Sequence, residues 1–272
     1  MVDLTIEPMQ RLYVEQDMKS PELLRLNRGK AMTQCRSCPG KTEPNDDSAA
    51  VVQTTAGVIL LVIADGVGGC PHGHQASAIA VQTLTKSVLD AAPMTGVRDA
   101  ILDGIEQANQ AILDLSIGAA TTLAVVEVQD QVARGYQVGD STSLILGQRG
   151  SIKWKSTPHS PVGYAIEAGM LTEADAMHHE QRHVVSNLVG SRNMHIEIGP
   201  AQPLATRDTI IVGSDGLFDN VKIEEVIEHG RCGKLTRRMK CLDDLATERM
   251  TLNQPGEPGK PDDLSMIIYT PT

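Results

Sequence analysis

Four short segments, spread along the chain, place aspartates next to glycine or proline. They are residues 44–47 (PNDD), 64–69 (ADGVGG), 213–219 (GSDGLFD) and 260–265 (KPDDLS). Several carboxylates that folding brings into one pocket repel one another unless a cation lies among them. Because oxygen ligands of this kind suit hard ions such as Mg²⁺ and Mn²⁺, these segments predict a metal-dependent enzyme.

Apolar runs adjoin three of these segments and are expected to position their carboxylates. Residues 58–64 precede Asp65, residues 209–212 precede Asp215, and residues 264–269 follow the last segment. A carboxylate at the end of a strand, beside a glycine turn, is held rigidly and points out of the sheet. We therefore expect the acidic side chains to meet at strand ends.

The rest of the pattern predicts antiparallel sheets with helices outside them, an α+β layered sandwich. Residues 1–31 carry little periodicity, so we treat them as an N-terminal extension of uncertain structure. Strands are expected at 49–53, 58–64, 121–128, 132–138, 143–147, 151–155, 209–213 and 264–269, with a hairpin turn at 54–57. Helices are expected at 75–92, where Pro93 would end the first, and at 97–115, 222–229 and 234–252.

Bulk properties narrow the function classes. The 272 residues carry a formal net charge of -10, which argues against a nucleic-acid surface. No apolar stretch is long enough to span a bilayer, and residues 1–7 lack a secretory pattern. Five cysteines cannot form a complete disulfide framework, so a reduced, cytoplasmic protein is the simplest interpretation.

A series of short motifs then identifies a family resemblance. In order, they are NDD at 45–47, ADGVGG at 64–69, TT at 121–122, VGDS at 138–141, HS at 159–160, SDGLFD at 214–219 and PDD at 261–263. The series resembles the metal-dependent protein phosphatases of type 2C, over roughly residues 32–270. Val67 resembles bacterial members, since the animal and plant branch has histidine there.

The resemblance implies a four-layer αββα sandwich, in which residues 32–272 form the catalytic domain and about 160–190 form a flap beside the active site. It also implies hydrolysis of phosphoserine and phosphothreonine in proteins, without a covalent intermediate, by a metal-activated water at a binuclear Mg²⁺ or Mn²⁺ centre. The expected partners are phosphorylated proteins, with a serine/threonine kinase acting in opposition. A monomer that binds neither nucleic acid nor membrane is expected.

The resemblance also assigns roles to individual residues. Asp65 would bridge the two ions, and the carbonyl of Gly66 would bind one of them. Asp215 and Asp262 would hold the other, so Asp65, Asp215 and Asp262 are the expected catalytic residues. Asp47 and Asp46 would bind through coordinated water, although Asp46 fits a solvent-facing acid equally well.

The chain departs from the family pattern near the substrate phosphate. The family has an arginine a few residues before the first acidic pair, whereas residues 40–44 here contain Lys41 and no arginine. Lys41 could bind phosphate as a point charge but not as a bidentate fork. A third ion, as an alternative, would depend on Asp219, because the usual third-site aspartate corresponds to Gly118 and Asp114 is a loose candidate.

Other readings stay open. A catalytically weak or silent relative could bind phosphoproteins as a regulatory module, and a third reading is a phosphoesterase for small metabolites. Asp140 is interpreted as a turn residue. Residues 178, 179 and 183 are a histidine group that invites a zinc site, but surface histidines are the preferred interpretation. Cys35-x-x-Cys38 is interpreted as a pair of reduced thiols, and GKT at 40–42 lacks the context of a nucleotide-binding loop.

Overall fold

The computed structural model describes residues 6–92, 95–252 and 256–272, which form two antiparallel sheets. The first sheet has the order β1-β4-β5-β6-β7-β10, with β11 also paired to β7. Its strands are β1 (Met9–Val14), β4 (Asp47–Gln53), β5 (Ile59–Asp65), β6 (Leu123–Gln129), β7 (Val132–Val138), β10 (Glu197–Ile198) and β11 (Gln202–Pro203).

The second sheet has the order β2-β3-β13-β12-β8-β9. Its strands are β2 (Glu22–Leu26), β3 (Gly29–Arg36), β13 (Leu264–Pro271), β12 (Thr209–Gly213), β8 (Thr142–Leu146) and β9 (Ile152–Lys155). Seven helices lie outside the sheets or in the connections: α1 (Gly73–Asp90), α2 (Val97–Asp114), α3 (Pro161–Glu167), α4 (Glu173–Ala176), α5 (Asp215–Phe218), α6 (Ile223–Gly230) and α7 (Leu235–Leu252), as counted over the described ranges.

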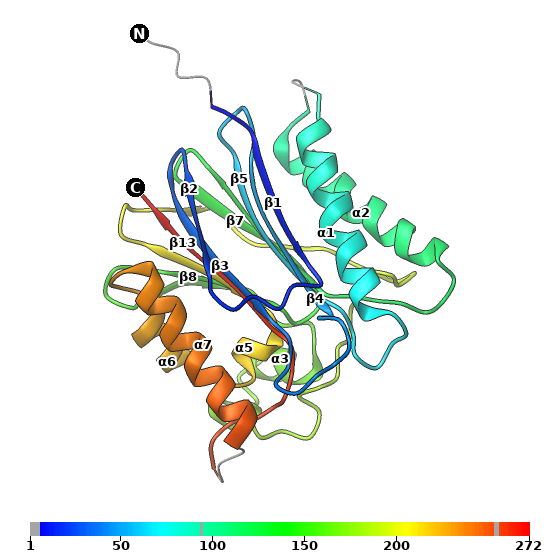
Figure 1. Ribbon diagram of the computed structural model, residues 1–272, viewed down its shortest axis with the longest axis vertical. Coiled ribbons are helices and arrows are strands. Elements are labelled where there is room, and N and C mark those ends of the chain that lie inside the picture. Colours follow the sequence, from blue (N-terminus) through cyan, green and yellow to red (C-terminus); the bar gives the residue numbers. More distant parts are fainter. Residues whose placement is uncertain (1–5, 93–94, 253–255) are drawn as a thin grey trace.

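Alternation along the strands explains the layers. In β4, Ala50 and Val52 join the core beneath α1 and α2, whereas Ala49 and Val51 face the space between the sheets. A strand that is buried on both faces must be apolar throughout, which is why 49–53 and 58–64 appear as continuous apolar runs. Figure 1 shows α1 and α2 covering one sheet and α6 and α7 covering the other. The predicted four-layer sandwich is therefore confirmed.

Residues 9–31, whose structure the sequence left uncertain, belong to the two sheets. Strand β1 pairs with β4 and lies at one sheet edge, and β2 pairs with β3 and lies at the edge of the other. Tyr13 and Leu24 are the buried apolar residues of these two edge strands. An edge strand with one buried residue carries almost no alternation, so the pattern gave no signal. The domain boundary expected at residue 32 falls inside β3.

The other expected elements agree with the structure to within a few residues. The hairpin of β4 and β5 and the helices α1, α2, α6 and α7 lie where the periodicity placed them. Pro93 lies outside the described residues, so its role as a helix stop stays a prediction. The short helices α3, α4 and α5 are too brief to produce a 3.6-residue period. Across the described ranges, no helix is both long and apolar enough to cross a bilayer.

Candidate active site

Two of the predicted aspartates meet across neighbouring strands. Asp47 begins β4 and is paired directly with Asp65, the last residue of β5. The Asp47 side chain is buried, and its Oδ2 accepts a hydrogen bond from the Ser214 hydroxyl at 2.8 Å. Its Oδ1 is also buried and has no hydrogen-bond partner among the described residues. A buried carboxylate oxygen without a donor is costly unless a cation binds there.

Asp215 and Asp262 reach the same end of the sandwich from the second sheet. Asp215 opens α5 directly after β12, and Asp262 lies two residues before β13, the neighbour of β12. The two strand ends are joined by Ser214, whose backbone N–H donates to the Ser265 carbonyl at 3.0 Å and whose hydroxyl accepts from the Ser265 N–H at 3.1 Å. The register of these strands thus carries the two carboxylates side by side.

Mutual repulsion shows that these carboxylates share one electrostatic environment. Burial, followed by the charges of Asp263, Asp262 and Asp215, raises the pKa of Asp47 well above its ordinary value. Burial and the charges of Asp215, Asp47, Asp262 and Asp140 raise the pKa of Asp65 in the same way. For Asp262, burial and the charge of Asp215 raise the pKa to about 6, although Lys260 opposes the shift. An environment that penalises several negative charges favours a bound cation.

Two further aspartates belong to this acidic cluster. Burial and the charges of Asp215 and Asp219 raise the pKa of Asp140 to about 8. Burial and the charge of Asp215 raise the pKa of Asp219 to about 7. Asp140, which we interpreted as a turn residue alone, therefore also faces the candidate site. Its motif (VGDS at 138–141) was the signal, but a Gly-Asp-Ser turn is too common for the carboxylate to stand out.

Lys260 was missed by the sequence analysis. Its ammonium lies among three carboxylates, in an ion pair with Asp215, at 2.9 Å from Asp262 Oδ2 and at 3.3 Å from Asp219 Oδ2. Burial alone would lower the pKa of this lysine, but the charges of Asp215, Asp219 and Asp262 raise it above its ordinary value. One clue was available, since Lys260 stands two residues before Asp262 in a predicted site segment.

Gly66 packs where the end of β5 meets the start of α1. A Cβ built on Gly66 would lie 2.3 Å from the carbonyl of Gly73 and 2.8 Å from the carbonyl oxygen of Asp46. The Gly66 N–H donates to that Asp46 carbonyl at 3.0 Å. A larger residue would push the helix away from the strand end, so glycine is required here by close packing. Binding of an ion by the Gly66 carbonyl stays a prediction.

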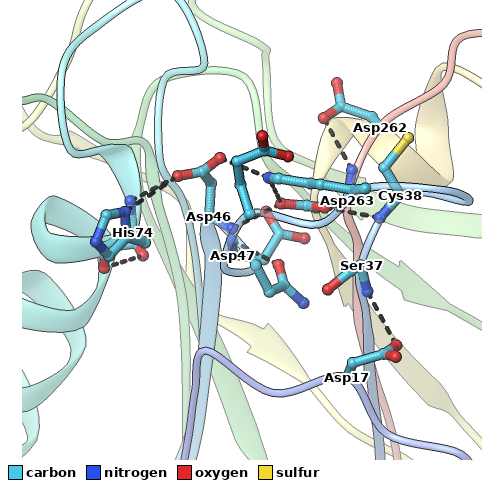
Figure 2. A network of polar contacts seen from close by, with 12 residues as sticks. Asp17, Ser37, Cys38, Asp46, Asp47, His74, Asp262 and Asp263 are labelled. Atoms are coloured by element: carbon cyan, nitrogen blue, oxygen red, sulfur yellow. Dashed lines mark hydrogen bonds and ion pairs between the residues drawn. The ribbon is translucent and has the colours of Figure 1, made fainter.

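Asp46 and Lys41 belong to a polar network beside the acidic cluster. Figure 2 shows Asp46 and Asp263 of this network near Asp47 and Asp262. Asp46 Oδ1 accepts from the backbone N–H of His74 at 2.7 Å, in the first turn of α1. The Lys41 ammonium lies 2.6 Å from Asp46 Oδ2 and 2.5 Å from Asp263 Oδ2. Burial disfavours the ammonium, but hydrogen bonds with Asp263 and Asp46 raise the pKa of Lys41. The Lys41 ammonium thus forms ion pairs with two carboxylates. Binding of substrate phosphate by Lys41 stays a prediction.

Asp263 is the second residue that the sequence analysis left without a role. Its side chain is 3% exposed, and its two oxygens accept backbone N–H groups of Cys38 at 2.7 Å and of Asp46 at 2.6 Å. Together with the Lys41 contact, these bonds fasten residues 38–46 to the start of β13. Figure 2 shows Asp263 between Cys38 and Asp46 in this arrangement.

The carboxylate donors suit hard divalent cations, although the side chains are not arranged as a ready coordination shell. Within the described ranges, no group of three or more His, Cys, Asp or Glu side chains is placed to hold a metal ion. The Lys260 ammonium lies among Asp215, Asp219 and Asp262, and an ammonium holds carboxylates around it as a cation would. The free Oδ1 of Asp47 and the raised pKa values of its neighbours indicate that Asp47, Asp65, Asp215 and Asp262 fit oxygen-liganded Mg²⁺ or Mn²⁺.

The histidine and cysteine alternatives find no geometric support. The side chains at 178, 179 and 183 lie at the surface, and among the described residues they belong to no group that could hold a metal ion. The five cysteines are free, and burial raises the pKa of the Cys35 thiol to about 12, which makes it unreactive.

A cavity of about 420 Å³ borders the acidic cluster. Asp140, Asp215 and Asp219 line one side of it, and its other walls include Lys155 of β9, Arg182 and residues of α3 and α4. Residues of the segment from 160 to 190 thus line this cavity, and the role of that segment as a flap stays a prediction. The cavity thus combines acidic and basic side chains, and Lys155 forms an ion pair with Glu173 of α4.

The base of this segment is fixed by a buried histidine. The Nδ1 of His159 accepts from the Gly139 N–H at 3.2 Å and lies 2.8 Å from the Asn187 side-chain nitrogen, while its Nε2 lies 3.2 Å from Glu197. The next residue, Ser160, caps α3 by accepting from the Gly163 N–H at 2.9 Å. The HS motif is thus structural, since it closes the segment on both sides.

The structure is thus a helix-flanked sandwich of two sheets, with a cluster of carboxylate oxygen donors at one end beside a cavity. Comparison with known proteins identifies the family. A family model described as Protein phosphatase 2C matches residues 35–250, so the chain belongs to the protein phosphatase 2C family. It is a protein serine/threonine phosphatase.

Individual relatives agree with this assignment. Protein phosphatase PhpP of Streptococcus pneumoniae is 29% identical over 197 residues, which are 68% of this chain and 78% of that protein. Serine/threonine phosphatase stp of Listeria monocytogenes is 26% identical over 201 residues, covering 69% of this chain and 79% of that protein. The solved catalytic domain of serine threonine protein phosphatase PstP, in complex with 2 manganese ions, has the same fold at a TM-score of 0.72 and 19% identity, covering 90% and 99% of the two chains.

Proposed function

We propose that this phosphatase hydrolyses phosphoserine and phosphothreonine in proteins at a binuclear centre of Mg²⁺ or Mn²⁺. When bound, such ions would acidify an attacking water and offset the charge of the phosphate during in-line displacement. The observation that carries the proposal is the convergence of Asp47, Asp65, Asp215 and Asp262 at one end of the sandwich, where burial and the neighbouring charges raise the pKa values of Asp47, Asp65 and Asp262. The manganese complex of the PstP relative supports the choice of ions.

Each residue has a separate task in this proposal. Asp65 would lie between the two ions, where its charge partly cancels their repulsion. Asp215 and Asp262 would hold one ion from the second sheet, and Asp47 would accept bound water through its free Oδ1. Gly66 has no side chain to block the end of β5, so the Gly66 carbonyl could approach an ion closely.

The segment at about 160–190 would shape the substrate site as a flap. It borders the cavity that contains Asp215 and Asp219, and the cavity also contains Lys155 and Arg182. These two cations would attract a phosphorylated segment of a substrate protein. An opposing serine/threonine kinase, a monomeric state and a cytoplasmic location stay predictions.

The test is hydrolysis by the full chain of a phosphothreonine peptide and of p-nitrophenyl phosphate, with Mn²⁺, with Mg²⁺ and with excess EDTA. We expect turnover with either ion, none with EDTA, and loss of turnover in Asp65→Asn. Absence of turnover at any ion concentration, with tight binding of the phosphopeptide, would instead indicate a silent binding module. Preference for small phosphorylated metabolites over the peptide would indicate a metabolite phosphoesterase.

A further inference from the structure

Lys260 places its ammonium among three carboxylates of the acidic cluster. Its ammonium contacts carboxylate oxygens of Asp215, Asp219 and Asp262. Asp215 and Asp262 are the two residues expected to hold one of the metal ions. The lysine side chain is 16% exposed, so its charge is directed into the cluster and not into solvent.

The backbone of Lys260 is fixed by a buried side chain, which shows that this placement is built into the fold. Asn220 is fully buried, and its amide oxygen accepts the Lys260 N–H at 2.7 Å. Its amide nitrogen donates to the Lys260 carbonyl at 2.9 Å and to the Gly216 carbonyl at 2.9 Å. Because Gly216 lies next to Asp215 in α5, Asn220 ties the lysine to the helix that carries its carboxylate partner.

We propose that Lys260 is a tethered cation that a divalent ion must displace from Asp215 and Asp262, so that this lysine sets the metal affinity of the site. The inference rests on the metal-dependent function proposed above. An ammonium and a divalent ion that contact the same carboxylates repel each other, so each binds more weakly while the other is in place. A lysine has a flexible four-carbon stem, so its head can leave while the backbone stays bound to Asn220.

Competition of this kind has two measurable consequences. Without metal, Lys260 offsets part of the repulsion among Asp215, Asp219 and Asp262 and holds the site together. With metal, the same charge opposes binding, so the affinity is lower than the carboxylates alone would give. Removing the lysine charge should therefore lower the stability of the metal-free protein and raise its affinity for Mn²⁺.

The experiment is calorimetric titration of Mn²⁺ into the EDTA-treated full chain, with the metal-free melting temperature measured in parallel. In Lys260→Met, we expect Mn²⁺ to bind at least about tenfold more tightly and the metal-free protein to melt at a lower temperature. Lys260→Arg keeps the charge and should bind Mn²⁺ as the wild type does. Lys240→Met, which removes an equal charge from an exposed ion pair on α7, should also match the wild type.

Unchanged or weaker Mn²⁺ binding in Lys260→Met would overturn the inference, and so would equal tightening in Lys260→Arg. In either case, a wild type that binds Mn²⁺ and hydrolyses the phosphopeptide would leave the proposed function standing. Failure of the wild type to bind Mn²⁺ or to turn over substrate would remove the proposed function and this inference together.

A second pair of variants carries the test if Lys260→Met does not fold without metal. The double variant Lys260→Met with Asp219→Asn restores the net charge of the cluster. It is compared with Asp219→Asn alone, so that the two proteins differ only in the lysine. Tighter Mn²⁺ binding in the double variant supports the inference, and equal binding overturns it.

Discussion

Lys41 and Lys260 each lie among aspartates at the same end of the sandwich, but their surroundings differ. Around Lys41, the oxygens of Asp46 and Asp263 also accept the backbone N–H groups of Cys38, Asp46 and His74. Around Lys260, one backbone donor is found among the described contacts of its three aspartates, from the Asp263 N–H to Asp262 Oδ1 at 2.9 Å.

This difference separates a network that fixed donors satisfy from the cluster where we propose that ions bind. The carboxylates around Lys41 are satisfied by fixed donors, and their bonds join the loop at 38–46 to α1 and β13. The carboxylates around Lys260 outnumber their donors, and repulsion raises the pKa of Asp219 to about 7 and that of Asp262 to about 6. A cluster that lacks donors is the one that gains most from an added cation.

The neighbours Asp262 and Asp263 provide the sharpest test, because the Asp262 side chain contacts Lys260 and the Asp263 side chain contacts Lys41. We expect Asp262→Asn to lower Mn²⁺-dependent turnover of p-nitrophenyl phosphate by at least about 1,000-fold, since changes outside the ligand shell already cost 10- to 100-fold. The metal-free melting temperature should stay the same or rise, because the substitution relieves repulsion. A variant that keeps wild-type turnover would exclude Asp262 from the metal site.

Asp263→Asn should have the opposite effect. The substitution removes the negative charge that pairs with Lys41. It also replaces one of the two oxygens that accept the backbone N–H groups of Cys38 and Asp46. We expect the unfolding free energy in urea to fall by about 3 kcal/mol, as when a buried ion pair loses one partner. Turnover per folded molecule should stay within about tenfold of the wild type. Large loss of turnover without loss of stability would place Asp263 in the ion site.

Added Mn²⁺ should stabilise the protein through the Lys260 cluster. At a concentration 100-fold above the dissociation constant, binding to the native state adds about 2.7 kcal/mol to the unfolding free energy. We expect the wild type and Asp263→Asn to show this gain in thermal melts and Asp262→Asn to lose most of it. Equal gains in all three proteins would mean that the ion binds elsewhere.

Lys41→Met should destabilise the protein by about 1–2 kcal/mol, because the buried Asp263 carboxylate loses its ion pair with the ammonium. The loss stays small because Asp263 still accepts two backbone N–H groups. The KM for a phosphothreonine peptide tests the other role predicted for Lys41. An unchanged KM fits a lysine that holds the loop, and a KM raised tenfold or more fits direct binding of the substrate phosphate.

The smallest effect is expected at an exposed ion pair outside both networks. Lys240 lies 2.8 Å from Asp244 on the surface of α7. Exposed pairs contribute little to stability, so Lys240→Met should not change the melting temperature measurably. A clearly lower melting temperature in this control would mean that the overall charge of the protein, and not the local networks, determines the stability of the variants above.

Much of the fold was visible in the sequence because its central elements are long and buried on a regular face. Strands β4, β5, β12 and β13 contain apolar runs, and α1, α2 and α7 repeat apolar residues at helical spacing. Strands β1 and β2 gave no such signal, because an edge strand buries few side chains. Short helices such as α5 are determined by their neighbours and not by their own period.

By itself, the sequence determined which residue types stand at which strand ends, since the motifs around Asp65, Asp215 and Asp262 are local. It also carried the family, because the order of those motifs is preserved along the chain. The tertiary structure alone decided which acids share a cation: Lys260 joins Asp215, Asp219 and Asp262, and Lys41 joins Asp46 and Asp263. These partners are up to 222 residues apart in the chain, so strand register and the bonds of Asn220, and not local spacing, bring them into contact.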